Sequence, residues 1–217
     1  MELDHVFILC DEGAPEAEAL LRLGVREGSS NTHPGQGTAC RRFFFANAYL
    51  ELGWVGDPAE AGSDAVKRTR LLDRWALRRA GACPFGIIMR PTAGEACSVP
   101  PFPVWRYAPS YFPEGMALDI AEGTLLSEPE VFYFAVGRNR GGARREPLDH
   151  AIPAMALRRV TIGGPVPDGL SSASRALVAS GVVTFEVAPT YTLTLDFSAA
   201  PDAVADLRPG LPLVLRW

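Results

Sequence analysis

The segment RRFFFANAYLELGWV, residues 41–55, constrains the fold of this chain more than any other part of it. Two apolar runs flank a short connection at Asn47, a pattern that predicts two neighbouring β-strands. Within the second run, Glu51 lies between two leucines. Side chains alternate between the faces of a strand, so Glu51 shares a face with Tyr49 and Gly53. A carboxylate on an enclosed face needs a partner, because burying it alone is costly.

The beginning of the chain predicts a strand followed by a helix. LDHVFILC, residues 3–10, is strongly apolar, and the segment after it has Pro15 near its start and Gly24 after its last turn, as helices do. Alternation along the strand leaves His5 on the face opposite the apolar side chains that pack under the helix, which are Val6, Ile8 and Cys10. With a short strand and loop before residue 41, residues 3–55 are predicted to form a βαβββ unit.

The last part of the chain repeats this order. LRRVTIGG is similar to LDHVFILC, SSASRALVASG to the first helix, and VTFEVAP with YTLTLDF to the later strands. We therefore predict a second unit over residues 157–197, with a strand-rich segment, residues 84–136, between the two units. The alternative, that an α+β protein offers such an order by coincidence, stays open.

Composition and charge argue against several classes of function. The formal net charge is -4 and the pI is near 5.4, which gives no general attraction to nucleic acid or to an anionic membrane. No apolar run approaches the length of a membrane span, and the acidic start is unlike a signal peptide. The cysteines are scattered without a CxxC pair and predict reduced thiols in a cytoplasmic protein; they are Cys10, Cys40, Cys83 and Cys97.

Five arginines gather on a predicted helix near residue 75. Because they alternate with leucines and a tryptophan, we expect a solvated helix face rather than a phosphate-binding patch. These residues are Arg68, Arg70, Arg74, Arg78 and Arg79.

Four stretches carry a resemblance to a known family. LDHVFI, HPGQGTACRRFFFANAYLELGWV, PFGIIMRP and PPFPVWRYAPSYFPEG together resemble the glyoxalase-like branch of the vicinal oxygen chelate superfamily, most strongly over residues 3–115. The resemblance implies an α+β fold of repeated βαβββ modules whose curved mixed sheets surround a cavity, here as a single compact domain over residues 1–217. It implies the fold with more force than the reaction, because this scaffold hosts isomerases, dioxygenases, epimerases and drug binders.

The resemblance also implies a divalent metal, for which His5 and Glu51 match the first two ligand positions. The later positions depart from the pattern: if residues 157–197 align with residues 3–55, Arg159 replaces the histidine and Thr194 replaces the glutamate. Two protein ligands do not make a tight site for a transition metal, so we expect no metal and no other cofactor.

Three interpretations of Glu51 stay open. In the favoured one, Glu51 is a general base or ligand-binding group with His5 as its partner, in a centre without metal. In the second, His5 and Glu51 hold a divalent metal, with His150 or water completing its shell. In the third, Glu51 forms a structural ion pair with an arginine, the candidates being Arg41, Arg42 and Arg159.

Other polar and aromatic side chains are candidates for binding a ligand, although each also fits an exposed turn or ordinary packing. They are Tyr49, His33, Gln36, Trp105, Arg106, Tyr107 and Arg159. The leading hypothesis is a glyoxalase-like protein that binds or transforms a small oxygen-bearing organic molecule; an enzyme would be a lyase or isomerase, or dioxygenase-like. The rivals are a sequestering protein of the drug-resistance type and an assembly module without a ligand. Neither nucleic acid nor a membrane is expected as a partner, and a homodimer stays open.

Overall fold

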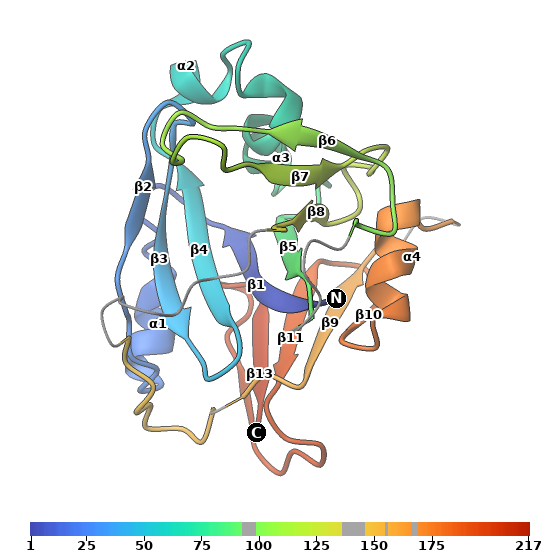
Figure 1. The fold of residues 1–217 in the computed structure, drawn as a ribbon. Coiled ribbons are helices and arrows are strands. Elements are labelled where there is room, and N and C mark those ends of the chain that lie inside the picture. The colour runs from blue at the N-terminus through green and yellow to red at the C-terminus, as the bar shows by residue number, and fades with distance from the viewer. Residues whose placement is uncertain (93–98, 136–145, 155, 166–168) are drawn as a thin grey trace.

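The computed structural model describes residues 1–92, 99–135, 146–154, 156–165 and 169–217, which form two β-sheets and a few short helices (Figure 1). The larger sheet has the strand order β2 (Asn31–His33), β3 (Thr38–Phe44), β4 (Tyr49–Val55), β1 (Glu2–Leu9), β5 (Phe85–Arg90), β8 (Glu130–Tyr133), β7 (Leu118–Ala121) and β6 (Val104–Tyr107). The smaller sheet has the order β10 (Val183–Val187), β9 (Arg159–Gly164), β11 (Thr192–Asp196), β13 (Leu213–Arg216) and β12 (Val204–Asp206). The helices are α1 (Ala17–Arg22), α2 (Pro58–Ala61), α3 (Leu71–Leu77) and α4 (Ser172–Ala179), with the 3-10 turn η1 (Lys67–Thr69) before α3.

The larger sheet is mixed and curls into a half-barrel, so the predicted α+β fold with curved mixed sheets is confirmed. The two ends of this sheet approach each other. Ser110, in the segment after β6, donates from Oγ to the carbonyl of Pro34 in the turn between β2 and β3, at 3.3 Å.

The larger sheet consists of two units with the same strand pairing. In residues 2–55, β1 pairs in parallel with β4, which is followed by the antiparallel β3 and β2. In residues 85–133, β5 pairs in parallel with β8, which is followed by the antiparallel β7 and β6. β1 and β5 run antiparallel and join the first unit to the second unit.

The order of elements in the sequence predicted the second unit at residues 157–197, and the strand pairing corrects this prediction. There β9 pairs in parallel with β10, the strand directly after helix α4, whereas β1 does not neighbour β2, the strand after α1. Residues 3–55 and 157–197 both have the order strand, helix, strand, and the sequence shows this order. It does not show which strands form hydrogen bonds with each other. The true second unit was missed because the described residues between β5 and β6 include no helix.

The predicted faces of β1 and β4 are confirmed. The side chains predicted to pack under a helix lie in the main core with residues of α1; they are Val6, Ile8, Cys10, Leu50 and Leu52. Phe7 and Leu9 lie on the other face, in a separate apolar cluster with Ile88 and Phe132. Phe7 reaches across β5 because residue 86 is glycine: a Cβ there would lie 2.1 Å from the Phe7 ring.

The smaller sheet packs against the first unit in the same core. The rings of Phe45 and Phe197 lie 4.7 Å apart between centroids, and both belong to the main core cluster. Asn47, in the turn of the predicted strand pair, both donates to the carbonyl and accepts from the N–H of Leu157 at 2.8 Å. The two sheets are therefore joined by packing and by a two-way hydrogen bond.

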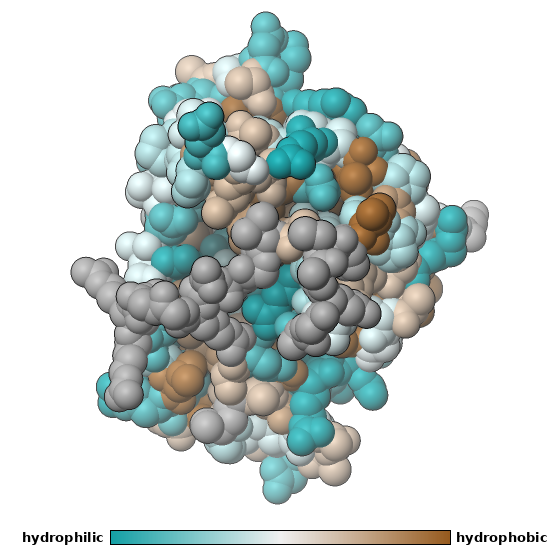
Figure 2. Space-filling view, in the orientation of Figure 1, coloured by the Kyte–Doolittle hydropathy of each residue, from teal (hydrophilic) through white to brown (hydrophobic). Residues whose placement is uncertain are grey.

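None of the helices in the described ranges combines the length and apolarity needed to cross a bilayer. On the face shown in Figure 2, apolar residues form isolated spots among hydrophilic ones, as is usual for a protein surface. Cys10, Cys40 and Cys83 are buried free thiols, and Cys97 lies outside the described residues.

The expected solvated arginine face is wrong for Arg74, whose side chain is 0% exposed. Its guanidinium donates to Glu130 at 3.0 and 2.9 Å and to four backbone carbonyls, those of Cys83, Leu125, Leu126 and Glu128. A buried guanidinium is tolerated when its donors are satisfied in this way. The pattern of arginines and leucines along the helix did not reveal it, because the acceptors come from residues 83 and 125–130.

Replacing Arg74 tests this contact. We expect Arg74→Ala to lower the free energy of unfolding by about 3–5 kcal/mol, because the Glu130 carboxylate is left buried without its partner. The matched control is Arg79→Ala on the same stretch of chain: Arg79 is 73% exposed and pairs with Asp11, so the loss should stay below about 1 kcal/mol. Urea unfolding of both variants measures this, and equal stabilities would contradict the role given to Arg74.

Candidate functional site

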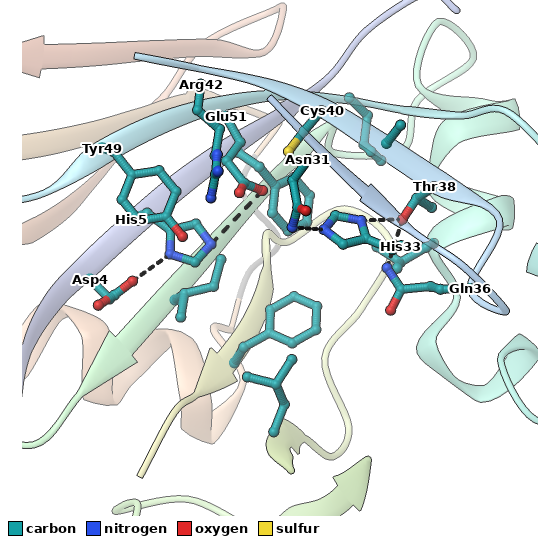
Figure 3. A pocket seen from close by; sticks show the side chains of 18 of the residues that line it. Asp4, His5, Asn31, His33, Gln36, Thr38, Cys40, Arg42, Tyr49 and Glu51 are labelled. Carbon is teal, nitrogen blue, oxygen red and sulfur yellow. Dashed lines mark hydrogen bonds and ion pairs between the residues drawn. The ribbon is translucent and has the colours of Figure 1, made fainter. Parts of the chain in front are cut away.

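A cavity of about 250 Å³ lies on the face of the larger sheet that carries Phe7 and Leu9, and both units of that sheet line it (Figure 3). Its polar lining comes from β1 to β4 and the β2–β3 turn: Asp4, His5, Asn31, His33, Gln36, Thr38, Cys40, Arg42, Tyr49 and Glu51. The cavity thus contains five of the residues predicted from the sequence to be catalytic or to bind a ligand, which are His5, Glu51, Tyr49, His33 and Gln36.

A β-bulge in β1 shapes the polar end of the cavity. Leu3 pairs with Met89 and His5 pairs with the adjacent Ile88, so Asp4 is an extra residue in the strand. Strict alternation would place Asp4 and His5 on opposite faces. Because of the bulge both line the cavity, and Asp4 Oδ1 lies 2.7 Å from His5 Nδ1.

Asp4 holds the His5 ring in one orientation. Its side chain is 4% exposed, and its second oxygen accepts a hydrogen bond from Arg90 Nη1 at 3.1 Å. A carboxylate is an acceptor, so the proton of the neutral His5 ring belongs on Nδ1. His5 Nε2 then faces Glu51 Oε2 across 3.9 Å (Figure 3), a distance longer than a hydrogen bond.

Glu51 faces the His5 ring at 3.9 Å, and none of the three candidate arginines pairs with it. Arg41 lies on the opposite side of β3 and binds Glu27 at 2.8 and 2.6 Å. Arg42 lies in the cavity and is the cross-strand neighbour of Glu51, yet among the described residues no ion pair joins the two. Arg159 is exposed on β9 in the smaller sheet. The interpretation of Glu51 as half of a structural pair with one of these arginines is therefore wrong.

Aromatic side chains stack behind this polar centre. The His5 and Tyr49 rings are stacked with centroids 4.1 Å apart, and Tyr49 stacks in turn on Phe44 at 5.1 Å. Burial raises the pKa of the Cys40 thiol, and the neighbouring Glu51 carboxylate raises it further, so Cys40 stays a neutral thiol.

His33 is the centre of a second hydrogen-bond network at the edge of the cavity. Its Nε2 accepts from Asn31 Nδ2 at 3.0 Å, which leaves the proton on Nδ1, 2.8 Å from Thr38 Oγ1. Gln36 donates to the same oxygen at 2.7 Å and accepts from the Tyr111 hydroxyl at 3.2 Å. This network fixes the segment that carries Tyr111 against β2. Burial lowers the pKa of His33.

Four residues predicted to bind a ligand do not line the cavity. Trp105 lies under the Arg68 guanidinium, 4.4 Å from its ring centroid, and Arg106 is exposed and donates to the carbonyl of Gly115. Tyr107 is buried in the apolar cluster around Phe7, and its pKa is raised to about 12 by burial. Arg159, the fourth, is on the other sheet. Aromatic residue types in a proline-rich segment did not reveal which of them reach the cavity; Tyr111 and Phe112 do.

The sequence analysis missed several lining residues. Thr38, Cys40 and Arg42 recur at every second position of β3, so the alternation used for β4 was sufficient to find them. Asp4 carried no such signal, because the bulge reverses its expected face. The apolar lining from the second unit depended on the pairing of β5 with β8; it includes Ile88, Leu118, Phe132 and Phe134.

The residues present do not fit the divalent metal of the superfamily. His150, the suggested third ligand, has both ring nitrogens engaged by backbone, with Arg26 N–H at 3.0 Å and the carbonyl of Phe44 at 2.8 Å. The second unit lines the cavity with Ile88 on β5 and Phe132 on β8, which are not metal ligands. Across the described ranges, no three His, Cys, Asp or Glu side chains lie close enough together to hold an ion.

Comparison with known proteins agrees with the sequence resemblance. Residues 3–96 match the family model described as a glyoxalase-like domain. Over residues 3–96 the chain therefore matches a glyoxalase-like domain, which is a domain of the vicinal oxygen chelate superfamily. No curated protein matches the chain. A solved structure described as a hypothetical protein from Staphylococcus aureus aligns with 10% identity over 99% of this chain and 98% of that chain, with a TM-score of 0.48.

Metal content follows from this ligand set. We expect protein purified without chelator to hold less than one equivalent of zinc, manganese, iron or nickel, because His5 and Glu51 alone leave most of a coordination shell to water. Elemental analysis measures this. One bound equivalent that is lost in His5→Ala or Glu51→Ala would contradict the expectation, and its loss in His150→Gln as well would identify His150 as the third ligand.

The burial of His33 predicts a pH dependence of stability. The ordinary pKa is 6.5, and burial lowers it in the folded chain, so the unfolded chain binds its proton first as the pH falls. The free energy of unfolding should therefore decrease below about pH 6.5, and His33→Gln should remove part of that decrease. Urea unfolding at several pH values measures the slope. An NMR titration that places His33 at or above its ordinary pKa would refute this.

Proposed function

We propose that this protein binds a small oxygen-bearing organic molecule in the cavity between its two units, and that it transfers a proton on that molecule. The observation that carries the proposal is the chain of three side chains at the polar end of the cavity: Asp4 bonded to His5 Nδ1, and Glu51 facing His5 Nε2. Their surroundings are half-buried, since the side chains of His5 and Glu51 are 15% and 13% exposed.

The arrangement suits His5 as a general base. With its proton on Nδ1 and donated to Asp4, the ring presents an unprotonated Nε2 to the cavity. When Nε2 takes a proton from the ligand, the carboxylate of Asp4 stabilises the imidazolium that forms. The same charge relation is found in catalytic histidines that are oriented by an aspartate.

Glu51 provides the second group that such a reaction needs. The 3.9 Å between its Oε2 and His5 Nε2 leaves room for a ligand hydroxyl or an acidic C–H group beside both. In an isomerisation, His5 removes a proton from a carbon next to a carbonyl and returns it to a neighbouring position, so protons balance without an oxidant or a co-reactant. Glu51 accepts a hydrogen bond from the ligand hydroxyl and orients it.

A sequestering protein without catalysis is the second candidate. It is supported by the apolar side of the cavity, where Phe112, Leu118, Phe132 and Phe134 offer contact area and no reactive group. The two candidates differ in what replacing His5 changes. In either case the variant still binds the ligand, but only an enzyme has a turnover that the replacement abolishes.

Solvent exchange distinguishes them. A panel of hydroxy acids, oxo acids and hydroxyketones is first screened by thermal shift, and the compounds that stabilise the protein are then followed by NMR for uptake of deuterium from solvent. We expect His5→Gln to slow exchange by about 10²–10⁴ and Asp4→Asn to slow it through the wrong ring tautomer, with thermal shifts retained.

The matched control is His150→Gln, which changes a histidine outside the cavity and should leave exchange unchanged. Binding with no exchange in the wild type would favour the sequestering protein. If no compound of the panel shifts the melting temperature or exchanges, the proposed function fails.

A further inference from the structure

We propose that the cavity accepts a small aromatic carboxylic acid, with its carboxylate on Arg42 and its ring against the second unit. This rests on the proposed function, in that the ligand is the one that occupies this cavity, and it names the chemical class of that ligand.

Most polar side chains that line the cavity come from the first unit, although Tyr111 comes from the second unit and the first unit also contributes Phe7, Leu9 and Trp54. All the residues labelled in Figure 3 belong to the first unit, and they are polar or carry a polar group. The second unit supplies mainly apolar side chains. Its paired strands β5 and β8 contribute Ile88 and Phe132, whereas the corresponding strands of the first unit, β1 and β4, contribute His5 and Glu51. A ligand that fills the cavity therefore needs one polar end and one apolar end.

Arg42 is the residue that specifies the charge of the polar end. Its Nε donates to the carbonyl of Ser29 and its Nη2 to Ser29 Oγ, both at 2.7 Å, and Ser29 Oγ in turn donates to Glu146 at 2.6 Å. These contacts fix the side chain. Figure 3 shows its guanidinium between Tyr49 and Glu51, directed into the cavity, and Nη1 has no hydrogen-bond partner among the described residues.

Arg41 shows by contrast what Arg42 lacks. It lies next to Arg42 on β3, faces the other side, and holds the carboxylate of Glu27 through two hydrogen bonds. Of the carboxylates around the cavity, Asp4 contacts Arg90 and His5, and Glu51 faces His5. Within the described chain, no carboxylate lies within ion-pair distance of Arg42. A fixed guanidinium with an unused donor suits a ligand carboxylate, which it binds by charge and by geometry.

The apolar end and the volume specify the rest of the ligand. Phe132, Phe134, Phe112 and Leu118 offer aromatic and aliphatic surface for a flat ring. The cavity of about 250 Å³ is below the ~300–1,000 Å³ typical of pockets for drug-sized molecules. A single ring with a short oxygenated acid chain fits this space.

Three matched probes test the inference by calorimetry: phenyllactate, lactate, and the diol in which a hydroxymethyl group replaces the carboxylate of phenyllactate. We expect phenyllactate to bind at least about tenfold more tightly than lactate, because the ring is buried. We expect a similar preference, about tenfold, over the diol, because the carboxylate is charge-paired with Arg42.

Variants assign each preference to its side of the cavity. Arg42→Gln should abolish the preference for phenyllactate over the diol, whereas the control Arg41→Gln should keep it. Leu118→Ser should reduce the preference over lactate and leave the preference over the diol. A purely structural role of Arg42 would weaken both phenyllactate and diol binding without changing their ratio.

Each of the remaining outcomes contradicts one part of the proposed ligand. Lactate that binds as tightly as phenyllactate refutes the apolar end, and leaves the proposed function standing. A diol that binds as tightly as the acid, or a ratio unchanged in Arg42→Gln, refutes the carboxylate. If none of the three probes binds, the inference fails, while the panel and the deuterium exchange described above decide the proposed function separately.

Discussion

The buried guanidinium of Arg74 joins helix α3, which contributes Leu71 to the lining of the cavity, to the second unit. Arg74 lies in α3, while its acceptors lie at residues 83 and 125–130, at the entries to β5 and β8 of the second unit. The same helix contributes Leu71 to the cavity, and Trp75 donates from Nε1 to the carbonyl of Cys10 at the end of β1. Because all these donors are satisfied, α3 is held between the two units and closes one side of the cavity.

The two units have the same strand order but differ in the side chains that they direct toward the cavity. Their pairing makes a continuous curled sheet whose inner face carries most of its polar groups on the first unit, beside Phe7 and Leu9, and mainly apolar groups on the second unit. In the first unit a single extra residue, Asp4, brings a carboxylate to His5, one of the two side chains that match the metal-binding pattern, and orients its ring. The superfamily resemblance concerns the scaffold that positions the strands, whereas the side chains on it can differ, and within the described ranges they provide no third metal ligand.

The sequence by itself determined the features that depend on neighbouring residues. The two-residue alternation of strands placed Leu50 and Leu52 in the core and His5, Tyr49 and Glu51 in the cavity, since the face of a side chain is a local property of an extended chain. The quoted stretches also identified the glyoxalase-like domain, which the family model confirms over residues 3–96. The α+β class followed from both.

The tertiary structure alone decided what depends on partners distant in the chain. Strand pairing shows that the second unit is residues 85–133 and not residues 157–197, and that Arg159 lies on the other sheet, away from the cavity. The order of elements along the chain could not show this, because it does not specify which strands pair. The burial of Arg74 depended on carbonyls about 50 residues away, and His150 was occupied by the backbone of Arg26 and Phe44. The bulge at Asp4 likewise arises from pairing with β5, so the Asp4–His5 contact could not be read from alternation.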